Sequence, residues 1–175
     1  KAAREKLADY SVNNISLLAG RGKSEDKIDR NYYVQYDMAK PHGDQSLPSS
    51  SAISANYSWT GRYFNNLVNP TRGYGLSFEV GAGSTLTPTR EPFTRLSTRW
   101  LSYVPLWRDA ETGRRNRLAL RANAGAVFAR KDVTLPVTLL FLAGGDTSIR
   151  GYKYQSIGAR MDNGDLIGGR YMVTG

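Results

Sequence analysis

The chain has 175 residues, enough for one ordinary domain, and no stretch approaches the run of about 18 apolar residues that a membrane-spanning helix needs. Lys and Arg number 24 against 15 Asp and Glu, a formal net charge of +9 that is typical of proteins binding nucleic acids or anionic surfaces. The chain has no cysteine, which excludes disulfides and thiolate metal sites.

Most of the chain alternates between apolar and polar residues, which is the pattern of a β-strand with one apolar face. Residues 52–63 show it most clearly: Ile53, Ala55 and Tyr57 share one face, and Ser54 and Asn56 share the other. Shorter or weaker alternation predicts strands at residues 10–19, 31–38, 74–80, 93–106, 117–128 and 171–175. The sequence therefore predicts an all-β antiparallel fold of about seven strands in one domain, residues 1–175.

Alternation alone leaves two architectures open, because a polar face can meet bulk water in a soluble sandwich or a wet lumen in a membrane barrel. The connection at residues 129–169 is by far the longest, and the outer loops of bacterial barrels are the long ones. In a barrel it would be extracellular. Strand alternation would place residues 40–51 and 82–92 at the same end, and 20–29, 64–73 and 107–116 at the periplasmic end.

The most informative stretch is residues 141–158. Gly144 and Gly145 allow a backbone course closed to other residues, and Asp146 can hold a turn. Arg150 presents a planar set of donors that suits a bidentate lock onto a carboxylate. Its neighbours are an apolar anchor, a glycine and an aromatic residue: Ile149, Gly151 and Tyr152.

These residues resemble the Omp85 family of outer-membrane β-barrels, in which a loop with a tip like Ile149-Arg150-Gly151-Tyr152 folds back into the lumen. Residues 153–158 and 163–166 look like the TamA (translocation and assembly module) branch. Asn69-Pro70-Thr71-Arg72-Gly73 resembles the family's inter-strand turn, and Tyr103-Val104-Pro105-Leu106 resembles the end of a later strand. The similarity runs from about residue 57 to residue 175.

The resemblance implies an antiparallel transmembrane β-barrel of about sixteen strands, of which this chain would be a part. The soluble periplasmic (POTRA) modules and the final strands of such a protein are not recognisable in the chain. The loop at about residues 131–168 would be directed into the lumen, where Arg150 would dock on a carboxylate. The expected partner is a carboxylate on a strand that is missing from this chain. Within this chain, Glu79 is the best candidate, because it lies on the polar face of its predicted strand.

The function implied is assistance in inserting or secreting other outer-membrane proteins in the bacterial outer membrane, without an enzymatic reaction or a cofactor. The implied partners are outer-membrane lipid and lipopolysaccharide, substrate outer-membrane proteins and a TamB-like inner-membrane-anchored protein, but no nucleic acid. One alternative is a two-partner secretion pore or a barrel appended to a lipase. A second alternative is a soluble, basic all-β module that binds nucleic acid.

Other motifs predict no site. Residues 20–24 end like a phosphate-binding loop, but Leu17 stands where such a loop needs glycine, so we interpret them as a basic turn. His42 is the only histidine and is expected in a polar loop. We interpret the pairs Asp26 with Asp29 and Asp162 with Asp165 as turn formers, and expect no metal site. The basic run is interpreted as charge on the lumen and rim: Arg108, Arg114, Arg115, Arg117 and Arg121.

Overall fold

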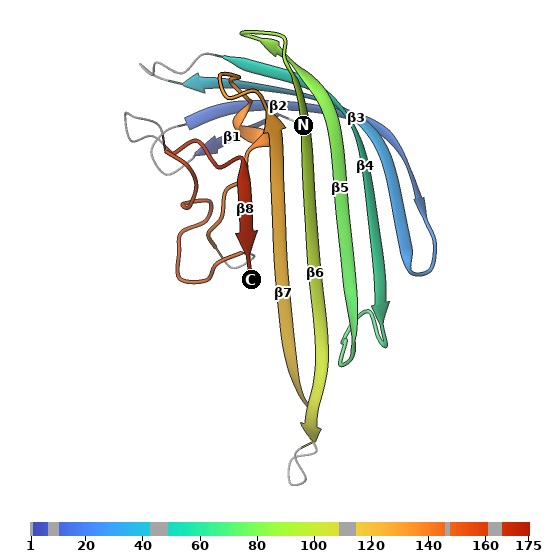
Figure 1. Ribbon diagram of the computed structural model, residues 1–175. Helices are drawn as coiled ribbons and strands as arrows, with labels where there is room; N and C mark the ends of the chain where they lie inside the picture. The colour runs from blue at the N-terminus through green and yellow to red at the C-terminus, as the bar shows by residue number, and fades with distance from the viewer. Residues whose placement is uncertain (1, 7–10, 43–48, 109–114, 146–147, 161–165) are drawn as a thin grey trace.

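The structure, a computed structural model, describes residues 2–6, 11–42, 49–108, 115–145, 148–160 and 166–175. The described strands form one antiparallel sheet in which each strand pairs with its neighbours in the sequence (Figure 1). The strands are β1 (Ala2–Lys6), β2 (Ser11–Ser24), β3 (Ile28–His42), β4 (Ser50–Phe64), β5 (Gly73–Thr87), β6 (Pro92–Arg108), β7 (Arg115–Ala129) and β8 (Tyr171–Thr174). A single turn of 3-10 helix, η1 (Val137–Leu139), follows β7. No helix in the described part of the chain has the length and apolar character to cross a membrane.

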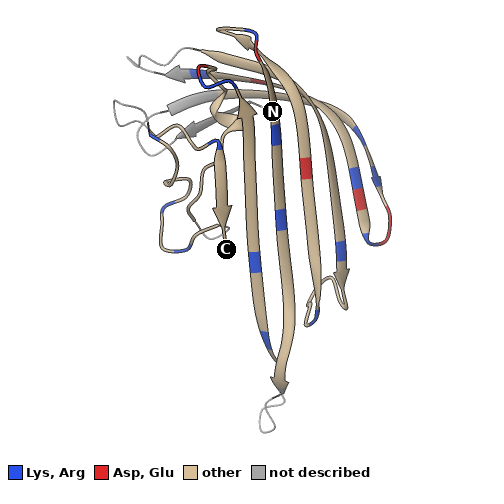
Figure 2. Cartoon of the chain, viewed as in Figure 1, with Lys and Arg blue, Asp and Glu red and all other residues tan. Residues whose placement is uncertain are grey.

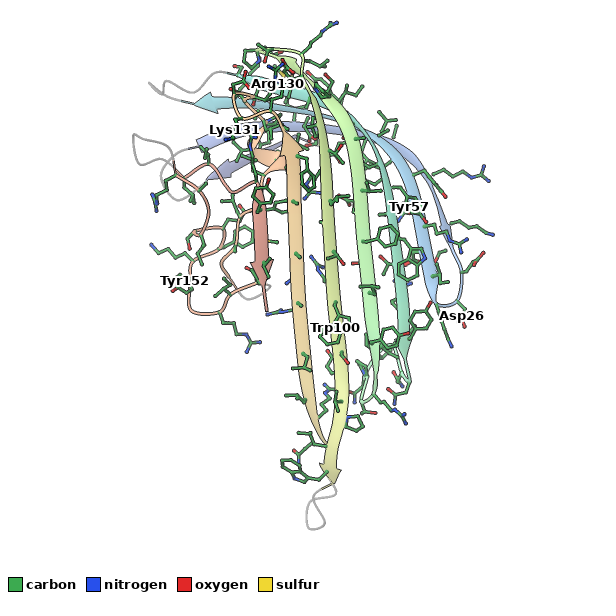
Figure 3. The ribbon with its side chains drawn as sticks, viewed as in Figure 1. Asp26, Tyr57, Trp100, Arg130, Lys131 and Tyr152 are labelled. Atoms are coloured by element: carbon green, nitrogen blue, oxygen red, sulfur yellow. The ribbon has the colours of Figure 1, made fainter. Side chains whose placement is uncertain are left out.

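The sheet is strongly curved, and its two faces differ in chemistry (Figures 1 and 3). On β4, Ile53 is 42% exposed on the outer, convex face, whereas the next residue, Ser54, is 5% exposed on the concave face. The β4–β5 register places Trp59 opposite Phe78 and Tyr63 opposite Tyr74, and these rings lie 5.6 and 5.2 Å apart. The predicted faces of residues 52–63 are therefore confirmed, and the convex face is an exposed apolar surface.

The buried core lies on the concave face, near the end of the sheet where β7 ends. Its buried members are Ala52, Phe93, Val127, Val133, Leu135, Leu139 and Phe141. The last four belong to the segment between β7 and β8, which leaves the sheet edge and folds back across the concave face (Figure 1). Burial of its side chains against strand residues thus holds this segment on the concave face of the sheet.

Several predicted connections are too long, because the strands extend further than the alternation suggested. β2 continues to Ser24 and β3 starts at Ile28, so the expected connection at residues 20–29 is only a tight turn, closed by a 2.8 Å bond from Glu25 N–H to the Ile28 carbonyl. The interpretation of residues 20–24 as a turn is wrong. Two glycines there lack the apolar side chains that a period-two pattern needs.

Glycines also interrupt the alternation in the second half of β5, which runs to Thr87. The connection between β5 and β6 is therefore residues 88–91 instead of the predicted 82–92. His42 is the last residue of β3 and not a loop residue. β1 was not predicted, because residues 2–6 are mostly charged or small. These corrections lengthen the sheet without changing its order, and the all-β antiparallel prediction is confirmed.

The difference between the two faces predicts how arginine substitutions on β4 would affect stability in a membrane. If the convex face meets lipid, Ala55→Arg should lower the free energy of unfolding by about 2–4 kcal/mol, because a guanidinium in the hydrocarbon region is poorly solvated. Asn56→Arg, its matched control on the concave face of the same strand, should cost much less. Denaturant titrations in lipid vesicles measure both values. Equal losses at the two positions would contradict a lipid-facing convex surface.

Candidate functional site

The segment from residue 130 to residue 170, called the inner loop below, is the candidate functional element. It folds on itself through short ladders that pair Phe141 with Gly169 and Ala143 with Ile157. The first pair exchanges two backbone hydrogen bonds of 2.9 and 2.8 Å, and the second exchanges two of 2.8 and 2.9 Å. Although it lies outside the regular sheet, the loop therefore has backbone pairing of its own.

Phe141 fixes the middle of the inner loop to the wall. A Cβ atom at Gly125 on β7 would lie 2.4 Å from a carbon of the Phe141 ring, so only glycine leaves room for the ring at this point. On β6, the guanidinium carbon of Arg95 lies 4.8 Å from the centre of the same ring, within cation–π range. We call Glu79, Arg95 and Gly125 the wall socket of Phe141.

Arg95 connects the wall and the loop through polar contacts as well. Its Nη1 atom forms a 2.6 Å ion pair with Glu79 of β5. The Nε–H group of Arg95 donates a 3.2 Å hydrogen bond to the Leu139 carbonyl of η1. The side chains of Arg95 and Glu79 are only 23% and 30% exposed. At this burial the carboxylate neutralises a charge that would otherwise be costly beside an apolar core.

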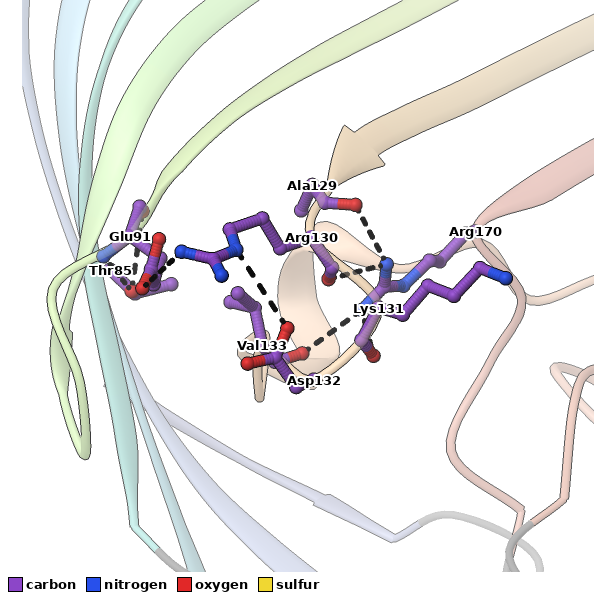
Figure 4. A network of polar contacts seen from close by, with 8 residues as sticks. All are labelled: Thr85, Glu91, Ala129, Arg130, Lys131, Asp132, Val133 and Arg170. Atoms are coloured by element: carbon purple, nitrogen blue, oxygen red, sulfur yellow. Dashed lines mark hydrogen bonds and ion pairs between the residues drawn. The ribbon is translucent and has the colours of Figure 1, made fainter.

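The two ends of the inner loop are joined by Arg170 (Figure 4). Its guanidinium donates to four backbone carbonyls where the loop begins: Ala129 at 3.1 Å, Arg130 at 2.9 Å, Lys131 at 3.3 Å and Val133 at 3.0 Å. We call this arrangement the Arg170 clasp. Because a guanidinium offers five donors in a fixed plane, arginine suits this role better than lysine.

Arg130 ties the base of the loop to the neighbouring turn between β5 and β6. It lies 3.5 Å from Glu91 and 4.0 Å from Asp132, while the backbone N–H of Glu91 donates a 3.0 Å bond to the buried Thr85 hydroxyl (Figure 4). The Arg130 side chain is 68% exposed, so these ion pairs add little stability. The Arg170 clasp is the stronger constraint on the base.

The paired glycines behave as their sequence predicts. Gly144 and Gly145 have φ of +115° and +93°, and the Gly144 N–H donates a 2.8 Å bond to the Ser148 hydroxyl. Gly151 also has a positive φ, +89°, but no atom lies within 4 Å of the position a Cβ would take. Although a glycine would permit another backbone to approach closely, none of the described residues does so at Gly151.

Arg150 and Tyr152 at the loop tip are exposed, Tyr152 by 59%. No ion pair joins Arg150 to a described residue, and Glu79, the candidate partner, is bound by Arg95. Asp146 lies outside the described residues. The tip is tied to the wall by a 3.4 Å bond from Arg121 of β7 to the Ser148 carbonyl. A carboxylate partner for Arg150 stays a prediction.

The space between the inner loop and the sheet is an open groove with a cavity volume of about 440 Å³. Its lining is mainly polar and includes Ser58, Ser77, Arg99, Asn123, Tyr154 and Gln155. No cluster of His, Asp and Glu suited to a metal ion occurs among the described residues. The groove can therefore offer hydrogen-bonding partners to an extended chain, but no metal centre built from described side chains.

Residues 69–72 of the predicted inter-strand turn lie between β4 and β5, and Gly73 is the first residue of β5. Asn65, just before this turn, accepts bonds of 3.1 and 3.0 Å from the Thr71 and Arg72 N–H groups. Arg117 of β7 donates to the Asn69 side chain at 3.0 Å and to the Pro70 carbonyl. Of the predicted basic run, Arg117 and Arg121 thus bind loops on the concave side, and residues 109–114 are outside the described part.

The predicted acidic pairs are not both turn formers. Asp29 lies within β3, where it accepts a bond from Ser24 and forms a 2.6 Å ion pair with Arg62. Asp26 lies in the turn before β3, as expected (Figure 3). Asp162 and Asp165 lie outside the described residues.

Comparison with solved structures shows that the fold has a known counterpart. The crystal structure of BamA from Haemophilus ducreyi lacking POTRA domains 1–3 superposes with a TM-score of 0.69 at 19% sequence identity. The match covers 94% of this chain and 36% of that one, so the chain spans little more than a third of the BamA structure. At this identity, the likeness shows a shared fold.

Comparison with protein families gives the relationship in sequence. The model of the Omp85 superfamily domain matches residues 7–175. That match covers β2 to β8 together with the inner loop, the wall socket and the Arg170 clasp. The chain therefore belongs to the Omp85 superfamily.

Proposed function

We propose that the chain forms part of a transmembrane β-barrel in the bacterial outer membrane that assists the assembly or translocation of other outer-membrane proteins. The observation that carries the proposal is the pairing of an exposed apolar convex face with a polar concave face that the chain covers with its own inner loop. Such a sheet has its apolar surface where lipid would be and its polar surface where a water-filled lumen would be.

The exposed apolar surface also argues against a soluble nucleic-acid-binding module. Large apolar side chains remain exposed on several strands, among them Leu17 at 59%, Tyr32 at 60% and Tyr171 at 68%. Contiguous apolar surfaces of this kind mark contact with membranes or other proteins. Several strand arginines on the concave face are occupied with loop carbonyls or amide oxygens, as Arg95, Arg117 and Arg121 show, and are not arranged for phosphate.

Within the superfamily, we assign the chain to the TamA type, because residues 153–158 and 163–166 resemble that branch. A TamB-like inner-membrane-anchored protein would then be the partner. A two-partner secretion pore and a barrel appended to a lipase are the alternatives, and a hydrolase nucleophile motif in the same gene product would identify the second. The mechanism proposed is mechanical: a substrate strand is guided by backbone pairing at a strand edge, beside the inner loop.

The functional test expresses the Arg150→Lys variant of the full-length protein in cells depleted of the native copy. We expect the yield of folded outer-membrane substrates to fall on the order of tenfold, since a lysine cannot reproduce two parallel hydrogen bonds to a carboxylate. Immunoblots of heat-modifiable substrate barrels measure the yield. Arg160→Lys, an exposed loop arginine outside the motif, is the control. Unchanged substrate assembly on depletion would contradict the proposed function.

Sidedness gives a second test. We expect Lys131→Cys and Asp132→Cys at the exposed base of the inner loop to react with a membrane-impermeant maleimide on intact cells. The matched control, Asp26→Cys in the turn between β2 and β3, should react only after the outer membrane is broken. The reverse pattern would place the inner loop at the periplasmic end.

A third test concerns the docking of the inner loop. Gly125→Ala should displace the Phe141 ring, because overpacking typically costs about 1–3 kcal/mol, and loop cleavage by trypsin should accelerate about tenfold. Ala119→Val, an added volume at an exposed position on the concave face of β7, should leave cleavage unchanged. Equal cleavage in the two variants would show that the wall socket does not hold the loop.

A further inference from the structure

Three cations share the convex face at the end of the β2–β3 hairpin: Arg21, Lys23 and Arg30. The register places Lys23 directly opposite Arg30, and Arg21 opposite Tyr32, so Arg21 is a diagonal neighbour of Arg30. Figure 2 shows Lys and Arg at this end of the hairpin, with Asp and Glu between them. Directly opposed side chains have Cβ atoms about 4.5–5.5 Å apart, and like charges at that spacing destabilise a sheet. The arrangement is therefore unfavourable unless an anion joins it.

The acidic residues of the hairpin neutralise this cluster only in part. Glu25 forms a 2.7 Å ion pair with Lys23, and its pKa is lowered by that hydrogen bond and then by the charges of Lys23 and Arg30. Asp29 alternates to the concave face, where it pairs with Arg62. Glu25 is therefore the one described carboxylate that forms an ion pair within this cluster, and no described residue forms an ion pair with Arg21 or Arg30.

Aromatic rings border the cluster on the side facing the middle of the sheet. Tyr32 lies 4.8 Å from Tyr57 between ring centres, Tyr57 lies 5.8 Å from Phe78, and Trp59 stacks on Phe78 at 5.6 Å. Trp59 is opposite Arg30 across the β3–β4 pair. Tyr and Trp rings with basic residues just beyond them are typical of the level at which lipid headgroups lie.

We propose that Arg21, Lys23 and Arg30, with Tyr32 and Trp59, bind the phosphate headgroup of an anionic phospholipid in the periplasmic leaflet. The inference rests on the proposed membrane placement, which puts this hairpin end opposite the inner loop. Arginine forks match phosphate oxygens in bidentate geometry. The acyl chains would follow the exposed apolar side chains above the cluster, such as Leu17 and Val34.

The test uses the full-length protein with every tryptophan except Trp59 changed to phenylalanine, reconstituted in phosphatidylcholine vesicles. Bromine atoms on an acyl chain quench a tryptophan that the lipid touches. We expect brominated phosphatidylglycerol to quench the fluorescence of Trp59 to the same extent at a mole fraction about fivefold or more below that of brominated phosphatidylcholine. The reason is that each basic residue attracts an anionic lipid. The preference should weaken at high salt.

The combined Arg21→Gln and Arg30→Gln variant should abolish this preference. The control carries Arg99→Gln and Arg117→Gln, which remove the same charge from the concave face and should keep the preference; circular dichroism confirms folding of both. Equal quenching by the two lipids would overturn the headgroup site alone, whereas no quenching by either would overturn the membrane placement and the site with it. Stronger competition by lipopolysaccharide than by phosphatidylglycerol would assign the cluster to the outer leaflet and overturn the periplasmic proposal.

Discussion

The contact between Arg95 and the inner loop is the interaction on which the rest of the concave side depends. A guanidinium next to an apolar core is tolerated only with a compensating charge, and Glu79 supplies it at 2.6 Å. The same guanidinium also contacts the inner loop. Its Nε–H donates a hydrogen bond to the Leu139 carbonyl, and its flat face lies over the Phe141 ring. Gly125 then decides whether the ring can reach the wall. Three strands thus contribute one residue each to a single docking point.

The attachment of the inner loop weakens from its base to its tip. Four carbonyls are held by Arg170 at the base, and buried apolar side chains hold the middle. Among its described residues, the tip is joined to the sheet by one long bond from Arg121 to Ser148, and Arg150 and Tyr152 are exposed. Because local opening follows the least protected contacts, the tip can detach or find another surface while the base stays in place. This gradient suits a loop whose tip engages a partner residue.

The sequence predicts what is local and misses what depends on distant backbone. Alternation placed Ile53 and Ser54 on opposite faces, because strand geometry alone determines that. It missed the second half of β5, where glycines remove the pattern. Both Arg95 and Glu79 were visible as polar-face residues, but their contact depends on the register of β5 and β6. The Arg170 clasp left no signal, since its four acceptors are carbonyls that every residue has.

The distribution of the +9 charge follows the same division between faces. On the concave side, arginines are engaged by carbonyls, amides and Glu79, so their charge is used to hold loops against the wall. On the convex side, Arg21, Lys23 and Arg30 lie together at one hairpin end, where they outnumber the single carboxylate that contacts them. A basic composition alone suggests nucleic acid, but a stacking platform along a groove should then accompany the cations. The contacting rings of Tyr32, Tyr57 and Trp59 lie on the convex face together with the apolar residues, and this placement favours a bilayer as the anionic surface.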